Sequence, residues 1–303
     1  MNYQFKASIT IPTFNRQQSL QQILEFLDQQ ESKYKNNFEV IIADDGSTDN
    51  TKTFVEKKIK EKAYTYPLSY LNTNLTEVFG ASIARNMGIK KAKGEYLLFL
   101  DDDFIPHKKW LNTLVETLEK GEKVIFGHAT HLKYKLQEDL PIKIEEDRLQ
   151  RLYELSLSNS LTELLTGNFA LSRECIQICG LFDERFARQD GYGYEDIEFG
   201  HRLIIGGFKI HYSVDALAYM PANPEDEKQK KEKLAEESKK TWLEIINNPQ
   251  ENLPITPFLK EYAKLILWHL KEHPEKNLPI SLMLLEYVRR RKDVIMKLKE
   301  LHK

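Results

Sequence analysis

Three consecutive carboxylates, Asp101-Asp102-Asp103, directly follow the apolar run Tyr96–Leu100. Like charges about 4 Å apart repel each other by roughly 1 to 4 kcal/mol, depending on their exposure. A divalent cation would relieve this repulsion. Ligands that are all oxygen favour Mg2+ or Mn2+, ions that usually complete their coordination with substrate phosphates. An acidic turn that only faces water needs no cation, and for an isolated Asp-x-Asp that simpler interpretation holds more often.

A second acidic pair, Glu195-Asp196, follows the segment Gly191–Tyr194, which reads Gly-Tyr-Gly-Tyr, and opens a predicted helix that reaches about Ile205. Transfer of a group to a hydroxyl needs a base within hydrogen-bond reach, and such a base contributes roughly 100- to 10,000-fold. Glycines allow close backbone approach, and aromatic faces suit a sugar ring. Acidic residues in a first helical turn also complement the helix dipole by about 0.3 to 1 kcal/mol, which alone would explain an isolated pair.

Short β-rich runs alternate with helical stretches through the first 130 residues, and these elements must position the acidic residues. The predicted strands are Ser8–Ile11, Phe38–Ala43, Leu68–Leu71 and Tyr96–Leu100, and the predicted helices are Gln17–Gln29, Asn50–Lys62 and Gly80–Ala92. Repeated β-α crossovers of this kind predict a largely parallel, buried sheet with helices on its faces. In such sheets, ligands bind at the carboxyl ends of the strands.

Polar segments stand where three of these strands end. The first strand runs into Pro12–Arg16, the second into Asp44–Ser47 and the fourth into Asp101–Asp103. Parallel strands end at the same edge of a sheet, so we expect the three turns to converge on one polar crevice, with carboxylates on two of them.

Four motifs occur in one order along this part of the chain. They are Pro12–Asn15 (Pro-Thr-Phe-Asn), Asp44–Thr51 (Asp-Asp-Gly-Ser-Thr-Asp-Asn-Thr), Ala84–Gly88 (Ala-Arg-Asn-Met-Gly) and Phe99–Asp103 (Phe-Leu-Asp-Asp-Asp). Each is weak alone, but the four in order resemble the pattern of family 2 glycosyltransferases. The resemblance covers roughly residues 5 to 220. It implies an α/β GT-A fold with a Rossmann-like, mostly parallel central sheet flanked by helices.

The resemblance implies donor-binding roles for the residues of these motifs. The implied contacts are Pro12, Thr13 and Asn15 with the nucleotide, Asp44 and Asp45 with uracil and ribose, and Arg85 with the diphosphate. The turn after the second strand also has a purely structural interpretation, in which Ser47 or Thr48 caps the next helix; the two roles do not exclude each other. For Arg85 the alternative is a solvated charge on a helix.

The resemblance also implies a Mn2+ or Mg2+ cofactor. Asp103 would bind the metal directly, with Asp101 as a second candidate ligand, while Asp101 and Asp102 would lie near the ribose or a metal-bound water. Many relatives place a further metal-binding His after the strand that follows the Glu-Asp helix. Here that strand ends Ala216–Met220 without one, and His211 stands earlier, where a strand residue is the favoured interpretation. The third protein ligand is therefore open.

The Glu-Asp pair looks like the Gly-x-Gly-x-Glu-Asp element of family 2 and of related galactosyl and N-acetylgalactosaminyl transferases. The resemblance implies that Asp196 is the general base in inverting members and that Glu195 contacts sugar hydroxyls. Gly167-Asn168 matches a Gly-Asn element of the same families, so Asn168 is expected to line the sugar site.

These features predict a metal-dependent glycosyltransferase that moves a hexose or N-acetylhexosamine from a nucleotide-sugar, most simply a UDP-sugar, to an acceptor hydroxyl with inversion. The acceptor would be a glycan, a lipid-linked sugar or a protein, in polysaccharide, glycolipid or glycoprotein assembly. A nucleotidyltransferase would need a glycine-rich phosphate loop after the first strand, and Thr13–Arg16 contains no glycine. The other alternative is a catalytically silent scaffold that binds nucleotide-sugars.

Composition excludes several other classes. With 303 residues, 41% hydrophobic and 30% charged, the chain is typical of a soluble globular protein of one large or two unequal domains. A net charge of -2 shows no overall bias toward nucleic acid, and no apolar run approaches the roughly 20 residues that span a bilayer. Cys175 and Cys179, four apart, indicate a buried helix face rather than a disulfide or zinc site. The expected location is the cytoplasm.

The composition changes beyond Pro221. We expect residues 1–220 to form the catalytic domain and residues 221–303 a charged linker followed by a helical extension. From Lys228 onward, 17 Lys and Arg stand against 11 Asp and Glu, a local charge of +6. The helix around Arg289–Lys292 has three interpretations: packing on its own domain with a solvated basic edge, which is favoured, contact with the inner membrane face, or docking of a partner protein.

Overall fold

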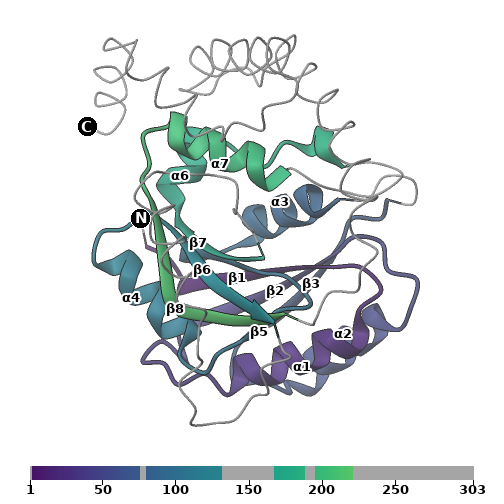
Figure 1. The fold of residues 1–303 in the computed structure, drawn as a ribbon. Helices are drawn as coiled ribbons and strands as arrows, with labels where there is room; N and C mark the ends of the chain where they lie inside the picture. The colour runs from purple at the N-terminus through teal and green to yellow at the C-terminus, as the bar shows by residue number, and fades with distance from the viewer. Residues whose placement is uncertain (1, 76–79, 132–166, 188–194, 221–303) are drawn as a thin grey trace.

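The computed structural model describes residues 2–75, 80–131, 167–187 and 195–220 (Figure 1). The segment Gly191–Tyr194 and the predicted extension from 221 to 303 lie outside the described residues.

An eight-stranded sheet runs through this part of the chain in the order β3-β2-β1-β4-β7-β6-β8-β5. Its strands are β1 (Phe5–Thr13), β2 (Phe38–Asp44), β3 (Leu68–Asn72), β4 (Gly94–Leu100), β5 (Ile105–Pro106), β6 (Val124–His131), β7 (Asn168–Ser172) and β8 (Ile210–Met220). The first four strands pair in parallel, as predicted, and β6 pairs in parallel with β8. Strand β7 runs antiparallel between β4 and β6, and β5 runs antiparallel to β8.

The described helices are α1 (Gln17–Asp28), α2 (Thr51–Glu61), α3 (Ala81–Lys91), α4 (Trp110–Glu119), α6 (Arg173–Cys179) and α7 (Glu195–Ile205), with a short 3-10 turn, η1, at Glu184–Phe186. Helices α1, α2, α3 and α7 lie where the sequence pattern predicts them, and α6 carries the predicted helix face of the two cysteines, whereas α4 and η1 were not predicted. One local prediction is wrong: neither Ser47 nor Thr48 caps α2. That helix begins behind Asn50, which makes no side-chain cap hydrogen bond.

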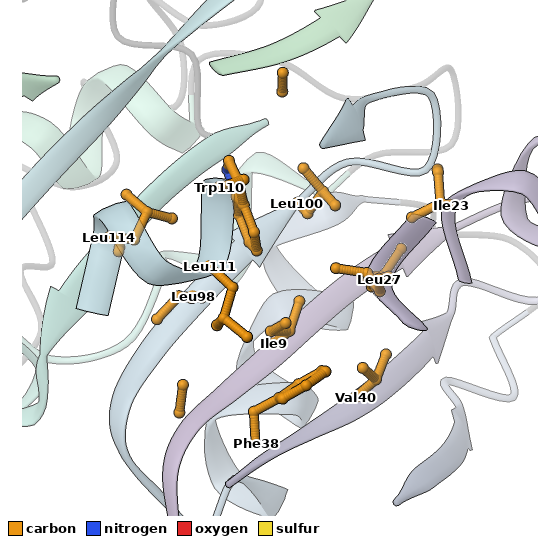
Figure 2. Close-up of a cluster of buried hydrophobic side chains, with 14 of the residues drawn as sticks. Ile9, Ile23, Leu27, Phe38, Val40, Leu98, Leu100, Trp110, Leu111 and Leu114 are labelled. Carbon is orange, nitrogen blue, oxygen red and sulfur yellow. The ribbon is translucent and has the colours of Figure 1, made fainter. Parts of the chain in front are cut away.

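Helices α1, α2 and α4 cover one face of the sheet; in Figure 1, α1 and α2 lie below it and α4 lies at its left. Strand residues that point to this face, such as Ile9 and Leu98, pack against Leu27 of α1 and against Trp110 and Leu114 of α4 (Figure 2). All five side chains are fully buried. Burying one such side chain contributes roughly 1.5 to 3 kcal/mol, so this layer fixes the β1 and β4 ends that carry the polar turns.

Helices α3, α6 and α7 cover the opposite face. Here Phe99 of β4 packs in one buried cluster with Phe199 and Leu203 of α7. Cys175 and Cys179 of α6 belong to the same cluster as free, buried thiols, as the sequence predicted. The helix that begins with the Glu-Asp pair is thus packed directly against the sheet.

Candidate active site

The turns after β1, β2 and β4 meet at one edge of the sheet. Thr13 and Asp44 are partners in the β1–β2 register, and the Asp45 N–H donates to the Thr13 carbonyl at 2.9 Å. On the other side of β4, the Asp101 N–H donates to the Gly167 carbonyl at 3.0 Å. The predicted convergence of the three turns is therefore present in the structure.

The acidic turn after β4 is held tightly to the end of β1. The Phe104 N–H donates to the Asp101 carbonyl at 3.0 Å, which closes the turn around Asp102 and Asp103. The Thr13 hydroxyl donates to Asp102 Oδ2 at 2.7 Å, and the Phe14 N–H donates to the same oxygen at 3.3 Å. Asp102 is therefore anchored by β1.

Burial raises the pKa values of two carboxyls in this turn. For Asp102 burial and the charges of Asp101 and Asp103 raise the pKa to about 7, although the Thr13 hydroxyl and Arg16 lower it. Burial, followed by the Asp101 charge, also raises the pKa of Asp103, and Arg16 again opposes the shift. Carboxylates that are crowded and desolvated in this way favour a bound cation.

Asp44 is buried and serves its own loop. Its Oδ1 accepts from the Ser47 N–H at 2.7 Å, and its Oδ2 accepts from the Tyr70 hydroxyl at 2.5 Å. These bonds hold the Asp-Asp-Gly-Ser turn against β3.

Asp45 stands beside the start of α3. Its Oδ2 accepts from the Gly80 N–H at 2.5 Å. Burial raises the pKa of Asp45 to about 6, against the lowering effects of the Gly80 N–H and the Thr73 hydroxyl, and the Asp44 charge adds to the rise. Asp45 therefore titrates close to neutrality.

Asn15 joins the turns after β1 and β2. It adopts a left-handed backbone conformation with φ of 54°, and its Oδ1 accepts from the Thr48 N–H at 2.7 Å and from the Asp49 N–H at 3.2 Å. Its own N–H donates to Ser47 Oγ at 2.8 Å. These bonds position the Asp-Asp-Gly-Ser turn. Pro12, the next-to-last residue of β1, is buried.

Arg85, in α3, lies between two of the acidic segments. Its Nη1 donates to Glu195 Oε1 at 2.8 Å, and its Nη2 donates to Asp101 Oδ1 at 2.9 Å. Burial acts to lower the pKa of Arg85, but the charges of Asp101 and Glu195, together with that of Asp196, outweigh it and leave the pKa raised. The alternative interpretation of Arg85 as a solvated charge on a helix is wrong, because the residue is only 2% exposed.

Glu195 and Asp196 differ in their surroundings. Glu195 opens α7, is buried, and directs its carboxylate to Arg85. Asp196 is the next residue, is partly exposed, and is close enough to contribute to the raised pKa of Arg85. Three carboxylates thus surround one guanidinium, and Asp196 is the more accessible member of the Glu-Asp pair.

Asn168, at the start of β7, is fully enclosed by neighbouring elements. Its Oδ1 accepts from Trp110 Nε1 at 2.7 Å, and its Nδ2 donates to the carbonyls of His128 at 3.0 Å and Ala216 at 2.9 Å. These bonds join β7 to α4, β6 and β8. The expected place of Asn168 in the sugar site stays a prediction, and its amide is already occupied by protein partners.

The metal ligands expected in the acidic turn after β4 stay a prediction. No group of three or more His, Cys, Asp or Glu side chains among those residues is arranged to hold a metal ion. His211 is a β8 residue, as predicted, and its Nδ1 lies 3.5 Å from Glu122 Oε1. Any metal would therefore rely on carboxylates of Asp101–Asp103 together with phosphates and water.

Several residues that shape the site were not singled out by the sequence. Tyr70 binds Asp44, Gly80 binds Asp45, and Arg16 acts on the carboxyls of the β4 turn. The sequence carries a signal for two of them, because Gly80 precedes a helix and Arg16 directly follows the first polar motif. Tyr70 is one of several half-buried residues of β3 and carries no such signal.

The fold and the three converging polar turns, two of them acidic, are those of a glycosyltransferase with the GT-A fold. The family model described as "Glycosyl transferase family 2" matches residues 8–178, and the chain belongs to this family. The predicted fold and enzyme class are therefore confirmed.

Comparison with individual proteins agrees with this assignment. The chondroitin synthase of Pasteurella multocida (strain Pm70) is 28% identical over 268 residues, which cover 76% of this chain and 26% of that protein. The mannosyltransferase PcManGT from Pyrobaculum calidifontis, solved with GDP-Man and Mn2+, has a TM-score of 0.61 at 16% identity, covering 99% of this chain and 85% of the other. S. aureus TarS 1–349, solved with UDP-GlcNAc, has a TM-score of 0.56 at 19% identity, covering 88% and 73%.

These likenesses have clear limits. At such low identity the two solved structures show the fold alone. The chain spans between 25% and 35% of the length of three curated relatives, two chondroitin synthases and a hyaluronan synthase. None of the helices described in the structure is long and apolar enough to cross a bilayer.

Proposed function

We propose that the chain transfers a hexose or N-acetylhexosamine from a UDP-sugar to an acceptor hydroxyl, with inversion at the anomeric carbon. The observation that carries this proposal is that one guanidinium, that of Arg85, binds both Asp101 on the donor side and Glu195 of the Glu195-Asp196 pair. The donor class is supported by a solved structure of the same fold that holds UDP-GlcNAc.

The donor would lie across the turns after β1 and β2. Asp44 and Asp45 would face the uridine, because both are fixed at the carboxyl edge, Asp44 by the Ser47 N–H of its own turn and Asp45 by the Gly80 N–H at the start of α3. Thr13 would act from the end of β1, where its hydroxyl already orients Asp102. Asn15 would act by shaping the turn. This placement follows the general rule that ligands of open α/β sheets bind outside the carboxyl ends of the strands.

The acidic turn fits a Mn2+ or Mg2+ ion. Asp103 would be the main protein ligand and Asp101 the second candidate, with Asp102 beside them, and burial has raised the pKa values of Asp102 and Asp103. Mg2+ is commonly bound through one or two carboxylates together with substrate phosphates. When bound, such an ion supplies Lewis-acid stabilisation of the leaving diphosphate.

Asp196 is the proposed base. Glu195 is engaged by Arg85, which leaves Asp196 as the partly exposed carboxylate at the start of α7. The acceptor hydroxyl would give its proton to Asp196 while its oxygen forms a bond to the anomeric carbon. The bond from that carbon to the phosphate oxygen breaks on the opposite side, and UDP leaves. Attack from the face opposite the leaving group inverts the configuration.

The test begins with UDP release from a panel of UDP- and GDP-sugars, with Mn2+ or Mg2+ and with a cell extract as the acceptor source. We expect one UDP-sugar to be turned over. Asp196→Asn should keep UDP binding within about threefold and lower transfer at least 100-fold, the range typical of a general base. Asp215→Asn, the same exchange at an exposed position of β8, is the matched control and should change neither.

Three results would contradict the proposal. Binding of UDP-sugars without turnover under any condition would favour the scaffold, and release of pyrophosphate would favour a nucleotidyltransferase. If the Asp103→Asn variant kept the same dependence on metal, the assignment of Asp103 as the main metal ligand would be contradicted.

A further inference from the structure

Arg85 holds together two segments that are distant in the sequence. Its two terminal nitrogens donate to Asp101, 16 residues away at the end of β4, and to Glu195, 110 residues away at the start of α7. The guanidinium is buried, and its Cζ lies 5.6 Å from the centre of the Phe182 ring. Each terminal nitrogen thus donates one hydrogen bond to a protein carboxylate.

The neighbours of Arg85 on α3 hold the chain that leads to α7. Asn86 Nδ2 donates to the Phe182 carbonyl and to Glu184 Oε1, both at 2.9 Å, and Asn86 Oδ1 accepts from the Phe182 N–H at 2.9 Å. At the start of the helix, a Cβ on Gly80 would lie 2.6 Å from the Ala187 Cβ. Helix α3 therefore fixes the chain at residues 182–187 and again at 195.

The same helix also contacts the donor side of the site. The Gly80 N–H donates to Asp45, and Arg85 donates to Asp101. In this way α3 contacts both proposed halves of the reaction, through the Gly80 N–H at its start and through the Arg85 side chain.

We infer that Arg85 is a positioning residue that fixes the start of α7, and with it Asp196, relative to the acidic turn after β4. This inference rests on the proposed function. It gives Arg85 a role different from the diphosphate contact that the family resemblance implied, which stays a prediction; in the structure both terminal nitrogens donate to protein carboxylates. A buried ion pair is often no more stabilising than a packed apolar pair, so the arrangement is better explained by the geometry that it imposes.

Arginine is required at this position for a geometric reason. A guanidinium presents donors in a rigid, planar fork and can hold two carboxylates in a fixed relation, whereas the ammonium of lysine is a single point on a flexible stem. Arg85→Lys therefore keeps the charge and removes the fixed relation between Asp101 and Glu195. Glu195→Gln removes the charge of one partner from the same contact.

The experiment compares wild type, Arg85→Lys, Glu195→Gln and the double variant. UDP binding is measured by calorimetry with Mn2+, and kcat is measured as UDP release from the donor found in the panel. We expect UDP affinity within threefold of wild type in all variants and kcat lowered 10- to 100-fold in each single variant. The kcat of the double variant should lie within about twofold of the kcat of the slower single variant. Both changes remove the same contact between Arg85 and Glu195, so their effects should not multiply.

Arg202→Lys is the matched control. Arg202 is an equally buried arginine on α7 that holds Glu198 through two hydrogen bonds of 2.6 Å and also binds two carbonyls. This exchange should lower the melting temperature and leave kcat within threefold. A similar loss of kcat in this control would show a general packing effect and overturn the inference.

Two further results would overturn it. One is a tenfold or greater loss of UDP affinity in Arg85→Lys with unchanged uridine affinity, which would indicate a diphosphate contact. The other is a double variant whose losses multiply, which would show that Arg85 does not act through Glu195.

Hydrogen exchange separates this inference from the proposed function. If wild type turns over no donor, the proposed function fails, but the positioning role is still decided by exchange in peptides from 195–205. Faster exchange there in Arg85→Lys and Glu195→Gln, with no further gain in the double variant and no change over β1, supports the inference. Unchanged exchange in peptides from 195–205 overturns it.

Discussion

The carboxylates at the edge of the sheet are similar in type but differ in what they touch. Asp44 binds its own turn and Tyr70, Asp102 binds the end of β1, and Glu195 binds Arg85. Burial raises the pKa of Asp45 to about 6, and Asp45 lies in the turn that is proposed to bind the uracil base. A single acidic site thus contains groups with separate tasks.

We expect uridine binding to depend on the ionisation of Asp45. The N3–H of uracil is a donor, and the ionised carboxylate accepts from it, whereas the protonated carboxyl is a poorer acceptor. Because the pKa of Asp45 is about 6 in the free protein, the affinity for uridine should be constant above pH 7. Below pH 6 it should decrease, with a slope that approaches a factor of ten per pH unit. Uridine is the probe because it has no phosphate that titrates in this range, and NMR titration measures its dissociation constant.

Asp45→Asn provides the control. It should bind uridine more weakly at pH 8 and lose the slope below pH 6. A slope that persists in the variant would assign the titration to another group, and a flat wild-type profile would contradict the proposed contact with uracil.

Residue types were easier to predict than residue partners. The carboxylates and Arg85 stand out because their types and order match a known pattern. That Arg85 would bind Glu195, 110 residues away, depends on the packing of α3 against α7, which no local pattern contains. Asn15 shows the same limit, because its hydrogen bonds cross between two turns that only the folded sheet brings together.

At the scale of the elements, α3 depends on small side chains for its close approach to the sheet. A Cβ on Gly88 would lie 2.2 Å from Thr10 Cγ2 and 2.5 Å from Thr10 Oγ1. This contact sets the depth of the helix over β1, and therefore the height at which Arg85 meets its two carboxylates.

Gly88→Ala should destabilise the protein despite the better helix propensity of alanine. Overpacking a core typically costs about 1 to 3 kcal/mol, while Gly to Ala in a helix interior gains at most about 1 kcal/mol. We expect a net loss in the free energy of unfolding, measured by urea denaturation, and a lower transfer rate because α3 is displaced. Thr10→Ala removes the two nearest atoms, so the double variant should recover part of the loss. A Gly88→Ala protein at least as stable as wild type would contradict this account.

The sequence predicted the elements of the first half well because each is a local pattern. Strands β1 to β4 and the helices between them follow alternating apolar runs and turn signals. The reversed direction of β7 was not predicted, because it depends on the pairing of Leu100 with Asn168, which are separated by 67 intervening residues. Non-local register of this kind has no signature in a short window of sequence.

The whole molecule carries its charge unevenly. Its net charge is -2, whereas the residues from Lys228 onward carry +6, so the remainder carries -8. The acidic part contains the proposed metal site. The sequence predicts a helix around Arg289–Lys292 and favours its packing on its own domain, an interpretation that still leaves the basic edge in solvent. A polybasic edge attracts anionic surfaces by about 1 kcal/mol per Lys or Arg within a Debye length.

We therefore expect the full chain to sediment with vesicles that contain anionic phospholipid and not with neutral vesicles. Binding should weaken at least tenfold between about 50 and 300 mM salt, because screening shortens the reach of the charges. Replacing the four basic residues of Arg289–Lys292 with glutamine should reduce binding by a similar factor and leave UDP affinity unchanged. Glutamine at Lys57 and Lys60, two exposed positions of α2, serves as the control and should leave vesicle binding unaltered. If the chain stays in the supernatant with every vesicle, the basic edge would serve only for packing on its own domain or for docking a partner protein. A lipid-linked acceptor would then have to reach the acidic edge of the sheet without help from this segment.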